Sequence, residues 1–390
     1  MNGVLVIGAS VGGLTVVEAL RRKGYGGRIR LVGDEPHLPY DRPPLSKEIL
    51  TGRWPIERAL LRDREQLDDL DVELYLGRRA EQLDLEARTV CLDDGRHLRY
   101  DTLVIATGLA PRPLPSQPAI AGIHTLRTVD DTLALRRELP TARRVVIIGA
   151  GVLGCEIAAA ARSLGRQVTL IDPLSVPMAR QIGEELGARI AAMHQRRGVH
   201  LRMGAGVCGF NSVNGRIDAV ELADGEVVPT DLAVIAVGSV PATGWLTSSG
   251  LTLSDGIECD AYCRAAPDVY AVGDVARWRH PATGASTRLE NRTNATEQAI
   301  TVAANILRAD RPYTPTPYFW TDQYDTKIQV HGVIAPDSRI RLIEGDAAAG
   351  RFVALAESGD TVTAAIGWNH PRGVRTARGR GLGAVPAPVP

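Results

Sequence analysis

The sequence lacks the cysteine patterns of redox-active, disulfide-rich and zinc-binding proteins. Its 390 residues include five cysteines, an odd number, and no two of them form a CxxC pair. Three residues separate Cys259 from Cys263, which does not fit a thioredoxin-like motif, and no His-rich segment completes a zinc site. We therefore predict no metal site. Small buried thiols are expected instead, at Cys91, Cys155, Cys208, Cys259 and Cys263.

Long apolar runs and an excess of one charge are also missing. No stretch approaches the roughly 18 apolar residues of a membrane-spanning helix. Lys plus Arg and Asp plus Glu number 45 each, which argues against a nucleic-acid-binding surface as the main role. The first residues enter a strand-like stretch without the features of a signal peptide. We expect a cytoplasmic protein whose partners include neither nucleic acid nor membrane.

The C-terminal end of the chain, by contrast, has charged residues of one sign only. The last stretch, from Thr361 onward, has no acidic residue and contains Arg372, Arg375, Arg378 and Arg380. Two interpretations stay open, namely a solvated disordered tail and a patch for an acidic partner.

Apolar β-branched runs alternate with Ala- and Leu-rich stretches, a pattern typical of parallel α/β layers. A proline-rich segment at 111–118 fits a crossing between domains. Beyond residue 317, short alternating segments predict an antiparallel sheet in a small further domain. The predicted strands are 4–7, 29–32, 103–106, 145–148, 168–171, 234–237, 269–272, 327–333, 339–344 and 351–357, and the predicted helices are 14–23 and 152–164.

The most informative motif is Gly149-x-Gly151-x-x-Gly154, which follows an apolar strand and opens a helix. In such a loop the first glycine allows the tight turn, the second lets a pyrophosphate approach, and the third lets helix and strand pack. Asp172 ends the next strand, where an acid binds a ribose 2′-hydroxyl and repels a 2′-phosphate. NADH is therefore favoured over NADPH.

A second loop of this kind stands near the N-terminus as Gly8-x-Ser10-x-x-Gly13, with Asp34 ending the following strand. Serine replaces the middle glycine, and its hydroxyl can hydrogen-bond a phosphate. The alternative is a tight strand-to-helix turn without a ligand. Two dinucleotide loops in one chain indicate a held flavin and a nicotinamide that delivers hydride to it.

Four longer motifs sharpen this interpretation: LPYDRPPLSKEIL at 38–50, TLVIATG at 102–108, VYAVGDVA at 269–276 and YFWTDQYDTKIQVHG at 318–332. Together, from residue 1 to about 371, they resemble the FAD- and NADH-dependent ferredoxin reductases that serve cytochrome P450 and Rieske oxygenases. The resemblance implies a glutathione-reductase-like α/β fold with two Rossmann-type domains, for FAD and NAD, and a small α+β C-terminal domain. The implied boundaries are 1–112 with 242–315 for FAD, 113–241 for NAD, 316–371 for the C-terminal domain and 372–390 for an Arg/Gly/Pro-rich tail.

The resemblance also implies site residues. Lys47 would approach flavin N5, Glu156 would be its partner, and Trp320 would cover the flavin ring; these three form the predicted catalytic group. A lysine there stabilises the negative charge that arrives with hydride. The alternatives are a surface lysine, a helix-dipole acid and a core aromatic. Predicted cofactor contacts are Gly8, Ser10, Gly13, Asp34, Pro44, Lys47, Ala80, Thr107, Gly108, Arg127, Gly149, Gly151, Gly154, Glu156, Asp172, Gly238, Gly273, Asp274 and Arg292.

Three features depart from the family pattern. Ser10 replaces a glycine, Arg292 stands where family members often have an apolar or aromatic residue beside the flavin, and the end of the chain is rich in Arg and Gly. The partner-docking surface is therefore expected to differ.

The implied activity is hydride uptake from NADH by FAD, followed by single-electron transfer to a ferredoxin, either [2Fe–2S] or another small iron–sulfur carrier. Three alternatives remain. A disulfide or peroxide reductase needs a redox cysteine where this chain has RPPLSKEIL. A rubredoxin reductase differs only in the acceptor. A non-enzymatic NADH-sensing flavoprotein resembling apoptosis-inducing factor would be favoured by insertions that the sequence lacks.

Overall fold

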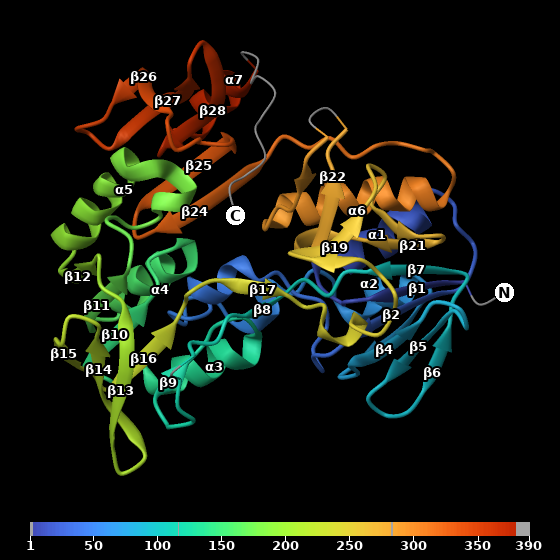
Figure 1. Ribbon diagram of the computed structural model, residues 1–390, viewed down its shortest axis with the longest axis horizontal. Coiled ribbons are helices and arrows are strands. Elements are labelled where there is room, and N and C mark those ends of the chain that lie inside the picture. Colours follow the sequence, from blue (N-terminus) through green and yellow to red (C-terminus); the bar gives the residue numbers. More distant parts are fainter. Residues whose placement is uncertain (1–2, 116, 282–283, 380–390) are drawn as a thin grey trace.

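A computed structural model describes residues 3–115, 117–281 and 284–379 of the protein. It contains three principal sheets, which occupy different parts of the molecule (Figure 1). Blue and yellow-to-orange segments share the first sheet, green segments form the second, and orange-to-red segments form the third. None of the helices in the described part of the chain has the length and apolar character needed to span a membrane.

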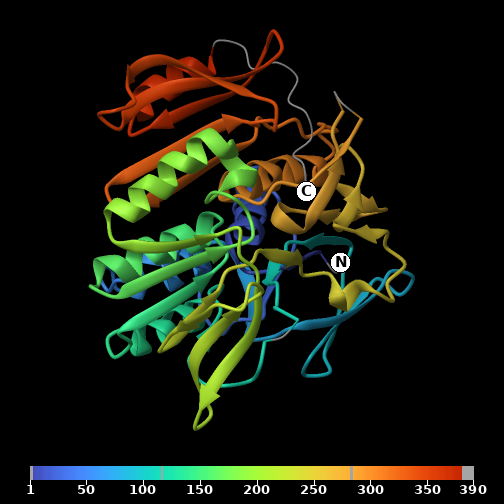
Figure 2. The same ribbon diagram turned by 60° about the vertical axis from the view of Figure 1, so that its left-hand side comes forward.

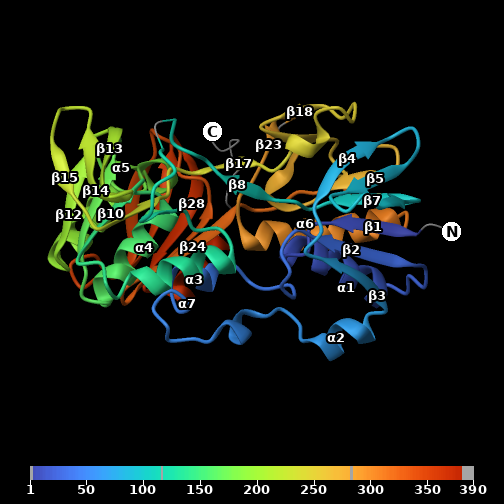
Figure 3. The same ribbon diagram turned by 90° about the horizontal axis from the view of Figure 1, so that it is seen from below.

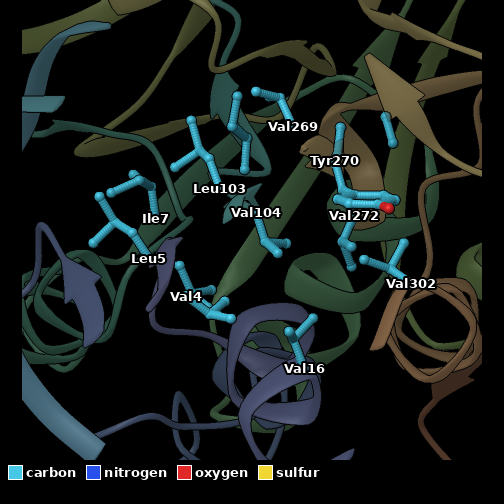
Figure 4. Packing of buried hydrophobic residues seen from close by; sticks show 14 of the residues in the cluster. Val4, Leu5, Ile7, Val16, Leu103, Val104, Val269, Tyr270, Val272 and Val302 are labelled. Carbon is cyan, nitrogen blue, oxygen red and sulfur yellow. The ribbon is translucent and has the colours of Figure 1, made fainter. Parts of the chain in front are cut away.

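The first sheet has six strands in the order β20-β21-β7-β1-β2-β3, and only β20 is antiparallel to its neighbour. Its β-branched strands are buried on both faces, as parallel strands covered by helices require. Figure 4 shows Val16 of α1 and Val302 of α6 beneath side chains of β1, β7 and β21. The bounds are β1 Val4–Ile7, α1 Val11–Arg22, β2 Ile29–Gly33, β3 Val72–Leu76, β7 Thr102–Ile105, β20 Arg264–Ala266, β21 Val269–Ala271 and α6 Arg292–Ile306.

The second sheet has five parallel strands in the order β12-β11-β10-β16-β9. Two short antiparallel strands, β8 and β17, connect it to the first sheet and lie between the two halves in Figure 3. Its bounds are β8 Leu109–Pro111, β9 Ile123–His124, α3 Val129–Glu138, β10 Arg144–Ile148, α4 Val152–Ser163, β11 Gln167–Asp172, α5 Ala179–Arg196, β12 Val199–Met203, β16 Leu232–Ile235 and β17 Ser239–Pro241.

The third sheet is antiparallel, with the order β24-β25-β28-β27-β26. Its inner face shares one hydrophobic cluster with the second sheet: Ile328 and Ile366 belong to the same cluster as Ile190 of α5. Figure 2 shows α5 lying along this sheet. The bounds are β24 Tyr318–Gln323, β25 Thr326–Gly332, β26 Arg339–Asp346, β27 Arg351–Ser358, β28 Thr361–Trp368 and α7 Pro371–Arg378.

Smaller elements pack around these sheets. They comprise α2 Arg64–Asp69, the sheet of β4 Ala80–Asp84, β5 Thr89–Leu92 and β6 His97–Arg99, the sheet of β13 Val207–Val213, β14 Arg216–Leu222 and β15 Val227–Pro229, and the sheet of β18 Leu253–Ser254, β19 Gly256–Cys259, β22 Ala276–Arg279 and β23 Ser286–Thr287. Short 3₁₀ turns are η1 Pro43–Ser46, η2 Ile56–Ala59, η3 Gly244–Leu246 and η4 Gly273–Val275.

The predicted fold class is confirmed, and every predicted strand and helix corresponds to an observed element within a few residues. The exact domain boundaries stay a prediction. The burial predicted for the five cysteines is correct for Cys155, Cys259 and Cys263, whereas Cys91 is half-buried and Cys208 is exposed.

The predicted tail is wrong for residues 372–378, because they belong to helix α7. Pro371 begins this helix, and the His370 ring accepts a hydrogen bond from the Gly373 N–H at its start. Val374 and Ala377, three residues apart, are buried against the third sheet. Arg372, Arg375 and Arg378 lie on the exposed side, while Arg380 and the rest of the predicted tail lie outside the described residues.

Candidate functional site

The first glycine of each loop has the same kind of backbone conformation. Gly8 has φ +117° and Gly149 has φ +104°, in the region that favours glycine. A Cβ on Gly8 would lie 2.1 Å from the Ala106 carbonyl oxygen, and one on Gly149 would lie 2.2 Å from the Ala236 oxygen. Neither position can therefore carry a side chain.

The third glycine of each loop is fixed in the same way. A Cβ on Gly13 would meet the Gly8 oxygen at 1.9 Å, and one on Gly154 would meet the Gly149 oxygen at 1.8 Å. The middle position of the second loop is not closed in this way. No described atom outside the local backbone lies within 4 Å of a Cβ placed on Gly151. Each loop thus presents the N-terminus of a 12-residue helix, α1 or α4, to a ligand phosphate.

Beside the first loop lies a cavity of about 580 Å³. Among the residues predicted to hold a flavin dinucleotide, Gly8, Ser10, Asp34, Ala80 and Thr107 line this cavity. Ser10 is the N-cap of α1, and its side chain makes no capping hydrogen bond within the described chain, so the hydroxyl is left for a ligand.

The cavity also has the polar groups that an adenosine dinucleotide needs. The indole N–H of Trp245, which lines the cavity, is buried without a hydrogen-bond partner in the described chain. Such an orphan donor is costly unless a ligand satisfies it. The residues present therefore fit the adenosine and pyrophosphate part of FAD.

Sequence reasoning missed a second group of cavity residues. Arg42 pairs with Glu35 at 2.8 Å, the Tyr40 hydroxyl donates to the same carboxylate at 2.5 Å, and all three line the cavity. Burial raises the pKa of the Tyr40 hydroxyl. Tyr40 and Arg42 belong to the LPYDRPPLSKEIL motif, which was the available signal.

Another cluster contains four further predicted residues, Gly108, Arg127, Gly273 and Asp274. The Nη2 atom of Arg127 lies 3.9 Å from Oδ2 of Asp274. The same Nη2 atom would lie 3.1 Å from a Cβ built on Gly108. Burial raises the pKa of Asp274, while Arg127 opposes part of the rise. The Arg127 Nε–H has no partner among the described residues. Gly273, next to Asp274, donates its N–H to the buried Gln298 side chain at 2.7 Å.

Lys47 and Glu156 form a buried ion pair. Lys47 comes directly after the 3₁₀ turn η1, which contains Pro44. Glu156 lies in α4, the helix that follows the second loop. Their Nζ and Oε2 atoms are 2.7 Å apart, and the side chains are only 11 % and 7 % exposed. The surface-lysine alternative does not fit this burial. A buried cation needs such a counter-ion, because an unpaired buried charge is strongly destabilising.

Glu156 accepts two further hydrogen bonds from buried hydroxyls. Ser46 donates to Oε2 at 2.6 Å, and Thr321 of β24 donates to Oε1 at 2.9 Å. Trp320, one residue before Thr321, is half-buried and stacks on Tyr318 with ring centroids 5.9 Å apart. The η1 segment and strand β24 of the third sheet thus both contact this carboxylate of α4.

Three predicted residues remain to be placed. Asp172 ends β11, and its carboxylate accepts the N–H groups of Ala150 at 2.6 Å and Leu174 at 2.8 Å. Gly238 follows β16 with φ +95°. Arg292, the first residue of α6, forms an ion pair with Asp41 through its Nε atom, 2.6 Å from Asp41 Oδ1.

The chain resembles known flavoprotein reductases along most of its length. Residues 2–299 match the family described as pyridine nucleotide-disulphide oxidoreductase, and residues 318–380 match the domain described as reductase C-terminal. The ferredoxin–NAD(+) reductase component of the biphenyl dioxygenase system of Paraburkholderia xenovorans is 36% identical over 91% of this chain and 86% of its own. Putidaredoxin reductase of Pseudomonas putida is 33% identical over 95% and 89%.

The solved structures include a ferredoxin reductase for the CYP199A2 system from Rhodopseudomonas palustris. It superimposes with a TM-score of 0.94 at 32% identity, covering 97% of this chain and 94% of that one.

Proposed function

This chain belongs to the pyridine nucleotide-disulphide oxidoreductase family, and from that premise we propose that it is an NADH-dependent ferredoxin reductase. FAD occupies the cavity at the first loop, and NADH binds at the second. Single electrons pass to a [2Fe–2S] ferredoxin or another small iron–sulfur carrier that feeds a cytochrome P450 or a Rieske oxygenase. Relatives named for such systems support the acceptor. We place the activity in the cytoplasm.

The observation that carries this proposal is the buried ion pair between Lys47 and Glu156 of α4, the helix that follows the second loop. When bound, FAD accepts hydride and releases electrons one at a time. Lys47 holds a fixed positive charge where negative charge develops during hydride transfer. Glu156 keeps that charge compensated, and Ser46 holds the carboxylate in place. Pro44 and Trp320 are proposed to line the flavin ring, and Arg127, Gly108, Gly273 and Asp274 its ribityl side.

Binding and orientation are assigned to the glycine loops. The free N–H groups at the start of α1 and α4 bind the two pyrophosphates. Asp34 and Asp172 are proposed to bind the adenosine riboses of FAD and NADH. Holding hydride donor and acceptor in register converts a bimolecular step into a unimolecular one. The carboxylate of Asp172 repels a 2′-phosphate, so NADH is preferred to NADPH.

A disulfide or peroxide reductase is disfavoured by the state of the cysteines. Burial raises the pKa of the thiols of Cys155, Cys259 and Cys263, which makes them poor nucleophiles. The segment that would hold a redox cysteine contains Ser46 and Lys47 instead.

An anaerobic titration of the purified protein with NADH, and separately with NADPH, tests the proposal. We expect a visible flavin band that NADH bleaches and NADPH does not, and reoxidation when a [2Fe–2S] ferredoxin is added. A colourless protein would contradict the assignment. A flavin that NADH reduces but that no ferredoxin or rubredoxin reoxidises would favour an NADH-sensing flavoprotein.

A further inference from the structure

A chain of buried side chains extends from Glu156 through the third sheet into α5. Gln323 Nε2 lies 3.2 Å from Thr321 Oγ1, and Gln323 Oε1 lies 3.0 Å from His194 Nε2. His194 Nδ1 lies 3.0 Å from the Tyr324 hydroxyl. The side chains of Thr321, Gln323 and His194 belong to residues with no solvent exposure.

The chemistry of its inner end fixes the direction of every hydrogen bond in this chain. The Glu156 carboxylate, which pairs with Lys47, can only accept, so Thr321 must donate its hydroxyl hydrogen to Oε1. The Thr321 oxygen therefore accepts from the Gln323 amide. That orientation directs the Gln323 carbonyl to His194, which must donate through Nε2.

The outer end of the chain follows from the same rule. Burial lowers the pKa of His194 to about 4, so the ring is neutral near pH 7 and carries one N–H. With that proton on Nε2, Nδ1 accepts from the Tyr324 hydroxyl. Burial raises the pKa of Tyr324, which stays a donor. The guanidinium carbon of Arg197 lies 5.1 Å from the centroid of the Tyr324 ring, so a cation stacks on this end of the chain.

We propose that Thr321, Gln323 and His194 are positioning residues that act on the reaction through Glu156. Each donates toward the carboxylate, and such hydrogen bonds polarise and strengthen one another in a dry interior. The chain holds Glu156 in the one orientation in which Oε2 receives Lys47 and Ser46. Docking of the third sheet on α5 thereby sets the position of the Lys47 charge.

This inference rests on the proposed function for its kinetic consequence, but not for its structural one. In oxidised holoenzyme labelled with ¹⁵N-histidine, the His194 signal, assigned by its loss in His194→Gln, should show the neutral Nε2–H tautomer at pH 7. Wild-type protein alone decides this point, because a proton on Nδ1 or a charged ring would overturn the proposal.

The substitution Thr321→Val tests whether the Glu156 carboxylate sets the donor–acceptor direction of the hydrogen bonds along this chain. The variant removes the hydroxyl between Glu156 and Gln323, so the His194 tautomer is no longer imposed and should become mixed. A purely structural threonine would leave the tautomer unchanged. Tyr324→Phe should preserve Nε2–H, because the direction is fixed from the other end.

The kinetic readout separates this inference from the proposed function. In stopped-flow flavin reduction, Thr321→Val should lower the limiting rate about tenfold, the effect of one charge-assisted hydrogen bond, with the Kd for NADH changed less than twofold. Thr321→Ser should restore the rate. Thr363→Val, at a buried threonine elsewhere in the third sheet, is the matched control.

Two outcomes distinguish a failure of this inference from a failure of the proposed function. If wild-type protein reduces ferredoxin but Thr321→Val matches it in rate and tautomer, the inference fails and the proposed function stands. If wild-type protein ignores NADH but shows the Nε2–H tautomer and its loss in Thr321→Val, the proposed function fails and the hydrogen-bond chain stands.

Discussion

At the scale of single residues, two aspartates show how one side chain can hold a strand end. Asp172 accepts the N–H groups of Ala150 and Leu174 at the carboxyl end of the second sheet. Asp231 accepts those of Arg143 and Arg144 at the opposite end of β10. The two make equivalent backbone contacts, yet only Asp172 lies beside a glycine loop.

Asp172→Asn is predicted to weaken NADH binding and cofactor selection together. An amide can satisfy one of the two N–H groups but brings its own donors to the other, and it no longer repels a 2′-phosphate. We expect the ratio of kcat/KM for NADH over NADPH to fall by about tenfold or more. Steady-state rates with each nucleotide measure this ratio. Asp231→Asn is the control, and equal effects from both variants would remove the assignment of Asp172 to the nucleotide.

His331 provides a second prediction at this scale. It is 6 % exposed, stacks on Tyr318 at 4.4 Å, and its Nε2 has no partner in the described structure. Burial, assisted by Arg378, lowers its pKa to about 4. Between that value and the usual value near 6.5, the unfolded chain binds a proton that the folded chain does not. Folding stability therefore rises with pH across this window and is lost as the pH falls.

His331→Gln should flatten this pH dependence. We expect the loss of unfolding free energy between pH 7 and pH 4 to shrink by about 2 kcal/mol, less than the full shift because solvent screens Arg378. Urea denaturation at several pH values measures it, with the exposed His97→Gln as control. An unchanged profile would mean that His331 titrates normally in the folded protein.

At the scale of elements, the loops and strands were predictable from the sequence and the side-chain network was not. Buried parallel strands and glycine loops leave local patterns of β-branched runs and fixed glycine spacing. His194 and Gln323, by contrast, lie 129 residues apart and meet only when β24 docks on α5. Helix α7 was missed because its arginines suggested a tail, although Val374 and Ala377 carry the helical spacing.

The glycine loops allow a paired test within one element. Gly154→Ala places a methyl group 1.8 Å from the Gly149 oxygen, whereas Gly151→Ala has open space and an ordinary backbone conformation. We expect Gly154→Ala to lower the unfolding free energy by about 3 kcal/mol. Gly151→Ala should fold normally and bind NADH more weakly. Thermal melts and NADH titrations distinguish them, and an unstable Gly151→Ala would contradict the observed spacing.

At the scale of the whole molecule, the formal charges sum to zero but are not evenly distributed over the surface. The chain has no net charge, yet α7 presents Arg372 and Arg375 to solvent on the third sheet. A local cationic surface accelerates encounter with an acidic partner, and the acceleration decreases as salt screens it.

Arg372→Gln with Arg375→Gln tests whether this surface meets the electron acceptor. We expect ferredoxin reduction at low salt to slow several-fold, with the difference from wild type vanishing as salt rises beyond about 0.3 M. Flavin reduction by NADH should be unchanged. Arg339→Gln with Arg341→Gln, on β26 of the same sheet, is the control. Equal low-salt rates for wild type and the α7 variant would place the docking surface elsewhere.

The repeated loop geometry also limits how the two copies can evolve. In each copy the first and third positions are closed by a carbonyl oxygen within about 2 Å of any added Cβ, and the middle position of the second copy is open. Substitutions at the closed positions are purged through misfolding before any ligand is involved. The fold itself tolerates a side chain at the middle position, which is Ser10 in the first loop and Gly151 in the second, so there only the ligand limits the residue. Between their first and third motif glycines the two loops differ at two positions, Ser10 against Gly151 and Gly12 against Leu153, and neither of these is a closed position.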